Sequence, residues 1–247
     1  MLEDAQIERY SRQIILPQVG GKGQEKLLRS QVYVDGDGLL AAAALFYLGA
    51  AGVGTIGVAR AKAAPIFSVL AERPLGSDEQ PVAHTLRRLN PDCTIVAHLD
   101  EDEQPPHHYD LVLATTDALH DGWHAQHKPF VWGAASGEGA CLFVSRGDRA
   151  DRPCLRCLFS ARVNLPSKRQ AKAGDPLDSP ALSPPYALFL GTQLVTEALK
   201  TILQPESDSP PKLLAYTFPA FHCTEQTVEK NPYCSVCSAQ RVNVSTA

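Results

Sequence analysis

Short apolar runs alternate with amphipathic stretches through the first half of the chain. Each run has about four residues, is rich in Val, Ile and Leu, and is bounded by turn residues, as strands buried on both faces of a sheet are. We expect strands at 31–34, 55–58, 94–97, 111–114 and 130–132, and helices at 39–50, 82–89 and 116–126. This alternation predicts an α/β fold, a Rossmann-like mixed sheet with helices on both faces.

The pattern changes after Gly133. Strands are expected at 140–144 and 212–218, and a helix at 186–203. Apolar residues recur on one side of that helix at helical spacing: Leu190, Leu194, Val195, Ala198, Leu199 and Ile202. The segment 164–185 is rich in Pro, Ser, Lys and Asp, and we expect a crossover loop there.

Composition narrows the class of protein. The chain has 247 residues, 44% of them hydrophobic, and a formal net charge of −4. This hydrophobic content excludes disorder as the main state, and an acidic chain without a basic block argues against nucleic-acid binding. Seven cysteines cannot all pair, and the start MLEDAQIERYSRQ resembles no secretory signal, so a reducing cytoplasm is expected.

One uncharged stretch, from Leu39 to Ala59, is long enough by count alone to span a bilayer. Four glycines crowd its second half: Gly49, Gly52, Gly54 and Gly57. A helix, a tight turn and a short strand explain this composition better than a membrane span does, so no membrane contact is expected.

The sequence Gly36-Asp37-Gly38-Leu39-Leu40-Ala41 fits G-x-G-x-x-A between a predicted strand and a predicted helix. Glycines at such a turn let the backbone approach phosphates, and the helix N-terminus favours negative charge. Asp35 and Asp37 oppose this, since a repulsion between unit charges about 4 Å apart costs about 4 kcal/mol at an effective dielectric of 20. A close-packed turn without ligand and a working nucleotide turn both remain open.

The end of the second strand offers a further alternative. An acidic residue there would hold a ribose, but the chain has Ala59 and Arg60. An arginine at this place can accommodate a 2′-phosphate, which makes an NADP-dependent oxidoreductase a formal option. Nothing else in the sequence supports hydride chemistry.

Two C-x-x-C pairs, Cys154 with Cys157 and Cys234 with Cys237, each place two thiolates within reach of one ion. Four thiolates make a closed tetrahedral zinc site, which is structural because no coordination position stays open. The alternative is a redox dithiol. The other three cysteines, Cys93, Cys141 and Cys223, are expected to be small buried side chains.

A second metal site is conceivable on the predicted helix 116–126. Asp117, His120, His124 and His127 follow one another at helical spacing. Gly122 weakens that helix, and we favour a solvated helix face over a metal site.

Taken together these features resemble the ThiF/MoeB/HesA family, the bacterial relatives of ubiquitin-activating enzymes. The similarity runs from Arg9 to Cys237. It is carried by 9–17 (RYSRQIILP), 20–27 (GGKGQEKL), 47–54, 111–113 with Thr116 and Asp117, 128–129, and both cysteine pairs. We expect one domain over 1–247: an N-terminal helical arm (1–30), a Rossmann-like half (31–133), and a second half (134–247) with the zinc site and the loop 164–185.

The resemblance implies the following roles. Members bind ATP and Mg²⁺, adenylate the C-terminal glycine of a ubiquitin-like sulfur carrier, and are generally dimers. Gly36 and Gly38 match the nucleotide turn, Asp117 the metal-facing aspartate, and Arg12 the arginine that reaches the partner's nucleotide. The four paired cysteines match the zinc ligands. A homodimer, or a heterodimer with an intact relative, is therefore expected.

Several family positions differ in this chain. Leu39 stands for a glycine of the turn, Ala59 or Arg60 for the ribose aspartate, and 61–80 lacks the usual acidic and basic run. The expected lysine falls near Asp78 or Glu79, and the loop 164–185 has no cysteine. Adenylation depends on stabilising phosphate charge, so these losses predict a pseudoenzyme that dimerises or holds a carrier without efficient ATP use. The alternative is an active adenylyltransferase with a rearranged nucleotide site.

Overall fold

The computed structural model describes the residues that form one mixed sheet and the helices around it. They are 1–36, 38–59, 81–98, 108–116, 123–124, 128–136, 139–145, 151–161, 184–204, 211–218 and 220–238. The predicted helix 116–126 falls largely outside them, as do most of the loop 164–185 and the segment 61–80.

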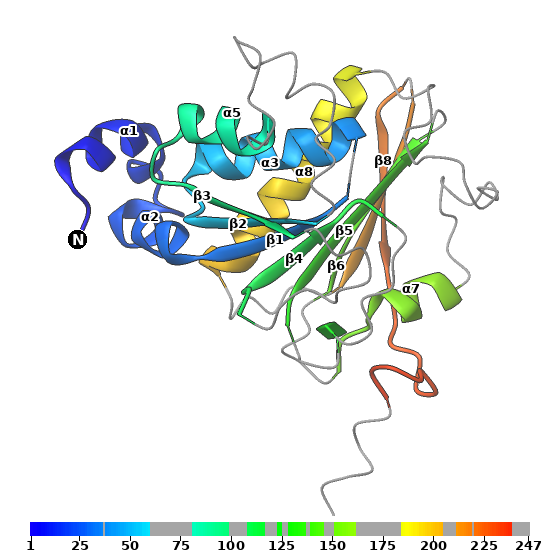
Figure 1. Ribbon diagram of the computed structural model, residues 1–247. Coiled ribbons are helices and arrows are strands. Elements are labelled where there is room, and N and C mark those ends of the chain that lie inside the picture. Colours follow the sequence, from blue (N-terminus) through cyan, green and yellow to red (C-terminus); the bar gives the residue numbers. More distant parts are fainter. Residues whose placement is uncertain are drawn as a thin grey trace, which may run out of the picture.

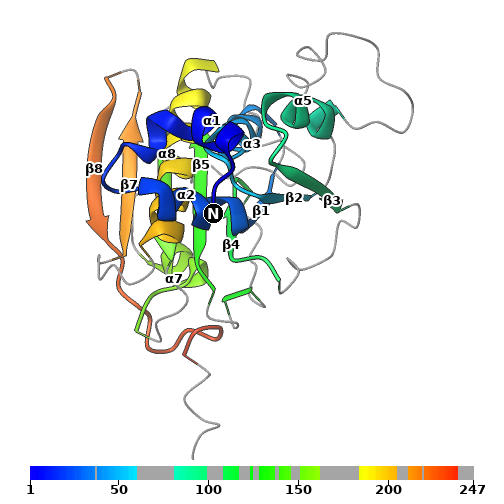
Figure 2. The same ribbon diagram turned by 90° about the vertical axis from the view of Figure 1, so that its left-hand side faces the viewer.

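The sheet has eight strands in the order β3-β2-β1-β4-β5-β6-β7-β8 (Figure 1). The strands are β1 (Gln31–Asp35), β2 (Thr55–Ala59), β3 (Thr94–His98), β4 (Leu111–Ala114), β5 (Phe130–Ser136), β6 (Gly139–Ser145), β7 (Lys212–Thr217) and β8 (His222–Thr227). The pairings among β1 to β5 are parallel, and those from β5 to β8 are antiparallel. The predicted mixed Rossmann-like sheet is confirmed, and Figure 2 shows β3 and β8 at its two edges.

Helices cover both faces of this sheet. They are α1 (Asp4–Ile14), α2 (Gly20–Arg29), α3 (Gly38–Ala51), α5 (Pro81–Leu89), α7 (Leu155–Ser160) and α8 (Pro184–Leu203). Helices α3, α5 and α8 lie on one face and α7 on the other (Figure 1). Within the described ranges no helix combines the length and apolar character needed to cross a bilayer.

The larger core lies between the sheet and helices α3, α5 and α8. The apolar side of α8 is buried there, as its sequence pattern predicts, with Leu190 and Leu194 fully covered. Gly191 allows the close approach of α8 to α3, because a Cβ at that position would lie 2.5 Å from the Cβ of Ala43. Since α3 is enclosed by strands and by α8, its uncharged sequence reflects burial in protein.

The opposite face carries the aromatic core, which includes Trp132 and Phe143 packed against Leu155 and Leu158 of α7. Tyr109 belongs to this core, and its ring crosses Gly57 on β2 so closely that a Cβ there would collide with it. The Tyr109 hydroxyl lies 2.8 Å from Nε2 of His98 on β3. Position 57 in β2 must therefore be glycine, because the ring of Tyr109, which precedes β4, occupies the space of a side chain there.

Polar contacts fix the N-terminal arm to helix α3 and to the connection between α5 and β3. The Tyr10 hydroxyl donates to Oδ2 of Asp92 at 2.9 Å and accepts from Nδ2 of Asn90 at 2.8 Å. Asn90 also donates to the carbonyl oxygen of Gly49 at the end of α3. Burial raises the pKa of Tyr10 to about 12, so the phenol stays neutral and supplies the proton for the bond to Asp92.

Element boundaries differ from the sequence predictions in a few places. Strand β5 continues to Ser136, four residues beyond the predicted strand, because β6 pairs with it along its whole length. Helix α8 begins at Pro184, inside the segment predicted as a loop. Strand β8 and helix α7 were not predicted at all.

Candidate functional site

The glycine turn lies where the strand order of the sheet reverses. Strand β1 is flanked by β2 on one side and by β4 on the other, so its carboxyl end lies at the point where the strand order changes direction. In open α/β sheets, ligands bind at such switch points. Gly36 and the start of α3 lie here, as the sequence predicts.

The chain is closely packed at this turn. A Cβ on Gly36, whose φ is +154°, would collide with the hydroxyl of Thr115 and lie 3.5 Å from the Cβ of Ala41. The amide of Thr115 donates to the carbonyl oxygen of Asp35 at 2.8 Å. Only glycine at position 36 lets the ends of β1 and β4 meet this closely, which supports the close-packing explanation of the motif.

Asp35 is the last residue of β1, and its side chain is 2% exposed. Its Oδ2 accepts a hydrogen bond of 2.9 Å from the hydroxyl of Thr116. The carbonyl oxygen of Thr116 in turn accepts from Nε1 of Trp132, a fully buried residue of β5. A buried carboxylate thus ends β1, and Thr116, which binds it, is itself held by Trp132 of β5.

The first turn of α3 follows directly. Gly38 begins the helix with φ +72°, a conformation that favours glycine. The side chain of Leu39 is half-buried in this turn. The helix has 14 residues, and the amides of its first turn and its dipole favour negative charge near its N-terminus. Asp37 lies outside the described residues.

The remaining predicted nucleotide positions are spread out. Ala59 at the end of β2 is buried and lies opposite His98 of β3 in the strand register. Arg12 is exposed on α1. Arg60 and Asp117 lie outside the described residues, so the structure does not place them relative to the turn.

The prediction of a solvated face for the histidine-bearing helix is wrong for His124. That side chain is 5% exposed, and its ring lies 4.9 Å from the ring of Phe130. The strand β5 covers it, so the position belongs to the core. His120 and His127 are outside the described part of the chain.

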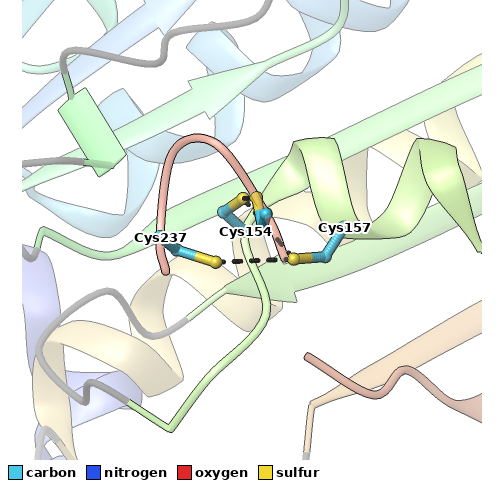
Figure 3. Close-up of side chains that lie close together, drawn as sticks. Cys154, Cys157 and Cys237 are labelled. Atoms are coloured by element: carbon cyan, nitrogen blue, oxygen red, sulfur yellow. Dashed lines mark hydrogen bonds between the residues drawn. The ribbon is translucent and has the colours of Figure 1, made fainter. Parts of the chain in front are cut away.

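The two cysteine pairs come together in space. The sulfur atoms of Cys154, Cys157, Cys234 and Cys237 all lie within 4.8 Å of one another. Cys154 to Cys157 is 3.8 Å, Cys154 to Cys234 is 3.6 Å, and Cys157 to Cys237 is 3.4 Å (Figure 3). Cys154 is the N-cap residue of α7 and Cys157 lies in its first turn, while the other pair comes from the chain after β8.

Local turns shape the second pair. Asn231 accepts the amide of Tyr233 on its Oδ1 and the amide of Cys234 on its carbonyl oxygen. The ammonium group of Lys230 donates to the carbonyl oxygen of Cys237 at 2.8 Å. The hydroxyl of Ser238 donates to the carbonyl oxygen of Asn231. These supporting residues were not predicted, although Asn231-Pro232 is a recognisable turn signal.

This cluster is chemically suited to a metal cation. A hydrogen bond from Cys154 lowers the pKa of Cys157 to about 4, so one thiolate forms readily, and donating that bond raises the pKa of Cys154. Sulfur atoms at the corners of a tetrahedron with metal–sulfur bonds of about 2.3 Å are about 3.8 Å apart. The observed spacings match this value, whereas a disulfide needs about 2.05 Å.

The cysteine cluster lies at the other end of the sheet from the glycine turn. Ser145, which ends β6, pairs with Phe130 at the start of β5, and its hydroxyl donates to the carbonyl oxygen of Pro153 beside Cys154. The turn, in contrast, lies at the carboxyl ends of β1 and β4. The cluster therefore does not contribute to chemistry at the turn.

Two of the other three cysteines are buried, as predicted. Burial raises the pKa of Cys93 to about 12, and Cys141 lies in the aromatic core. The prediction is wrong for Cys223, which is exposed on β8. Strand β8 forms the edge of the sheet, and its residues are largely exposed on both faces. Neither face of this strand therefore buries the Cys223 thiol.

Comparison with known proteins agrees with this architecture. The model of the ThiF family matches residues 80–236. A relative from Aspergillus niger, named adenylyltransferase and sulfurtransferase uba4, is 30% identical over 97% of this chain and 54% of its own length. One from Thermus thermophilus, named sulfur carrier protein adenylyltransferase, is 31% identical over 94% of this chain and 91% of its own.

The chain spans about half the length of the first fungal relatives, for instance 54% of the Aspergillus niger protein. Among solved structures, Escherichia coli MccB superposes with a TM-score of 0.70 at 16% identity, covering 93% of this chain and 72% of that one. MccB solved with ATP gives a TM-score of 0.68 at 15% identity, covering 93% and 74%. The fold, the sequence similarity along almost the whole chain and the match to the family model agree. This chain therefore belongs to the ThiF family.

Proposed function

We propose that this protein is an ATP-dependent adenylyltransferase that activates the C-terminal glycine of a small ubiquitin-like sulfur carrier. The observation that carries the proposal is the similarity to the Thermus sulfur carrier protein adenylyltransferase, which extends over 94% of this chain and 91% of that one. In this reaction the carrier's carboxylate attacks the α-phosphorus of ATP, and pyrophosphate leaves.

The glycine turn is the proposed nucleotide site. The N-terminal amides of α3 would donate to phosphate oxygens, and Gly36 and Gly38 form the turn that leads into this helix. Arg12, exposed on α1, is free to reach a second copy, and we propose a dimer in which it serves the partner's nucleotide. Asp117 is the proposed ligand of Mg²⁺, which would neutralise phosphate charge.

We propose further that Cys154, Cys157, Cys234 and Cys237 bind a structural zinc ion. Three of their sulfur–sulfur distances, 3.4 to 3.8 Å, suit tetrahedral coordination, and all four sulfur atoms lie within 4.8 Å of one another. The ion would tie the chain after β8 to helix α7, and it supplies no catalytic chemistry because all four positions are occupied by protein.

The pseudoenzyme hypothesis is the second candidate. Leu39 favours it, since its side chain is half-buried in the first turn of α3, where the family has a glycine. The names of the relatives favour the active enzyme, and we therefore place it first. Because binding of Mg-ATP separates the two hypotheses, calorimetry at micromolar protein is the first measurement to make.

The direct test is product formation. The protein is incubated with Mg-ATP and a carrier ending in glycine, and the carrier is examined by mass spectrometry for an added adenylyl group. A carrier lacking its last glycine is the control and should stay unmodified. Binding of ATP without any adenylated carrier, across carriers from the sulfur-transfer pathways, would favour the pseudoenzyme.

A further inference from the structure

Helix α1 carries Arg12 and lies at the periphery of the molecule (Figures 1 and 2). The helix has 11 residues, and helices of that length are marginal in water without tertiary contacts. Tyr10 is the one buried residue of α1, a helix that the structure describes over its full length. The position of this helix therefore depends on its polar contacts with the body of the protein.

Three of these contacts converge on one carboxylate, that of Asp92 in the connection between α5 and β3. Its Oδ1 accepts a hydrogen bond of 3.3 Å from Nε2 of Gln6. Its Oδ2 accepts from the Tyr10 hydroxyl at 2.9 Å and from the guanidinium of Arg9 at 2.5 Å. Positions 6, 9 and 10 lie on one face of a helix, so a single side chain of the body binds that whole face of α1.

The Asp92 carboxylate is charged and firmly anchored. Burial opposes its charge, but the hydrogen bonds from Tyr10 and the other two donors outweigh burial and lower its pKa. It is therefore ionised at neutral pH, and hydrogen bonds to an ionised group are stronger than those between neutral groups. The backbone amide of Asp92 donates to Oδ1 of Asn90 at 3.1 Å, and Asn90 is itself 1% exposed.

Arg12 lies between two points at which α1 is attached. Tyr10 precedes it by two residues, and Gln13 follows it and donates to the carbonyl oxygen of Ala51 at 3.3 Å. Because α1 is one continuous helix, these contacts also fix the backbone from which Arg12 extends. We infer that Asp92 is a positioning residue for adenylation, which holds α1 where Arg12 can reach the nucleotide of a second copy. The inference rests on the proposed function.

The test is a double-mutant cycle between Asp92 and Arg12, with carrier-dependent pyrophosphate exchange as the readout. The variants are Asp92→Ala, Arg12→Ala and the protein with both changes, and kcat and KM for ATP are measured for each. The matched control is Asp110→Ala, which removes an exposed carboxylate that accepts the amide of Gln31 at the start of β1. Hydrogen exchange of the α1 amides, compared with those of α8, reports on the helix independently of activity. Arg9→Ala, which removes one of the three donors, repeats the cycle if Asp92→Ala does not fold.

We expect Asp92→Ala to lower the exchange rate on the order of tenfold, mainly through kcat, because a displacement of about 1 Å can cost about 10²-fold in rate. The same change should have no further effect once Arg12 is replaced, and it should speed hydrogen exchange in α1 but not in α8. Asp110→Ala should match the wild type in both measurements.

Two results would overturn the inference and leave the proposed function standing. One is an equal fold-loss from Asp92→Ala with and without Arg12, which would show a general structural effect. The other is wild-type activity or wild-type hydrogen exchange of α1 in Asp92→Ala. Absence of pyrophosphate exchange in the wild-type protein would overturn both the inference and the proposed function.

Discussion

Replacing Cys157 by serine tests the metal centre most sharply. Cys157 is 1% exposed, and its sulfur lies 3.8 Å from that of Cys154 and 3.4 Å from that of Cys237. Serine keeps the size of the side chain but is a poor zinc ligand. We expect purified wild-type protein to contain about one zinc ion per chain and the variant to contain almost none.

The size of the stability loss follows from the coupling of metal binding to folding. Structural zinc contributes about 10–16 kcal/mol of binding free energy in small peptides, so losing even a fifth of that costs about 2–3 kcal/mol. For a chain of this length, each kcal/mol lowers Tm by roughly 2–4 °C. The Cys157→Ser variant should therefore unfold roughly 4–12 °C below the wild type.

The matched control is Cys223→Ser, because Cys223 is exposed on β8 and does not belong to the cluster. It should keep the zinc and the wild-type Tm. Titration of thiols before and after chelation adds a second readout, since four thiols should become reactive only when the metal is removed. A Cys157→Ser variant with full zinc content and unchanged Tm would refute the assignment.

Further predictions concern the packing of the fold. Tyr10→Phe removes the hydroxyl shared by Asn90 and Asp92 and should lower the free energy of unfolding by about 1–3 kcal/mol in urea titrations. Gly57→Ala should destabilise by more than about 2 kcal/mol because its Cβ meets an aromatic ring, whereas Gly21→Ala on α2 meets no atom within 4 Å and should stabilise slightly. Burial opposes the charge of Asp92, but hydrogen bonds from Tyr10 and other donors outweigh it and lower its pKa. This carboxylate therefore stabilises the fold above about pH 4 and loses its effect as pH falls through the lowered pKa, so Asp92→Asn should flatten the acid side of the stability–pH curve.

The elements with strong apolar patterns could be predicted from the sequence. Strands β1, β2 and β4 are buried on both faces, so their apolar runs are nearly continuous. The one-sided pattern of α8 likewise follows from its burial against α3 and the sheet. The glycine turn and the cysteine pairs were recognisable because each requires particular residue types at fixed spacing.

Elements held by tertiary contacts could not be predicted. Strand β8 has the sequence HCTEQT without an apolar side, and it exists because its backbone pairs with β7. Helix α7 has six residues, and its N-cap residue is Cys154 of the cluster. The contact between Tyr10 and Asn90 joins residues far apart in the chain, so no local sequence pattern predicts it.

Pyrophosphate exchange tests the central claim of adenylation most directly. Labelled pyrophosphate is incubated with the protein, Mg-ATP and a sulfur carrier, and its incorporation into ATP reports reversible formation of the acyl-adenylate. We predict incorporation that requires the carrier's C-terminal glycine and that falls at least tenfold in Arg12→Ala, since removal of one charge-stabilising donor commonly costs 10²–10³ in rate. Absence of exchange with every glycine-terminated carrier, from protein that is folded and loaded with zinc, would contradict the account and leave the pseudoenzyme as the better explanation.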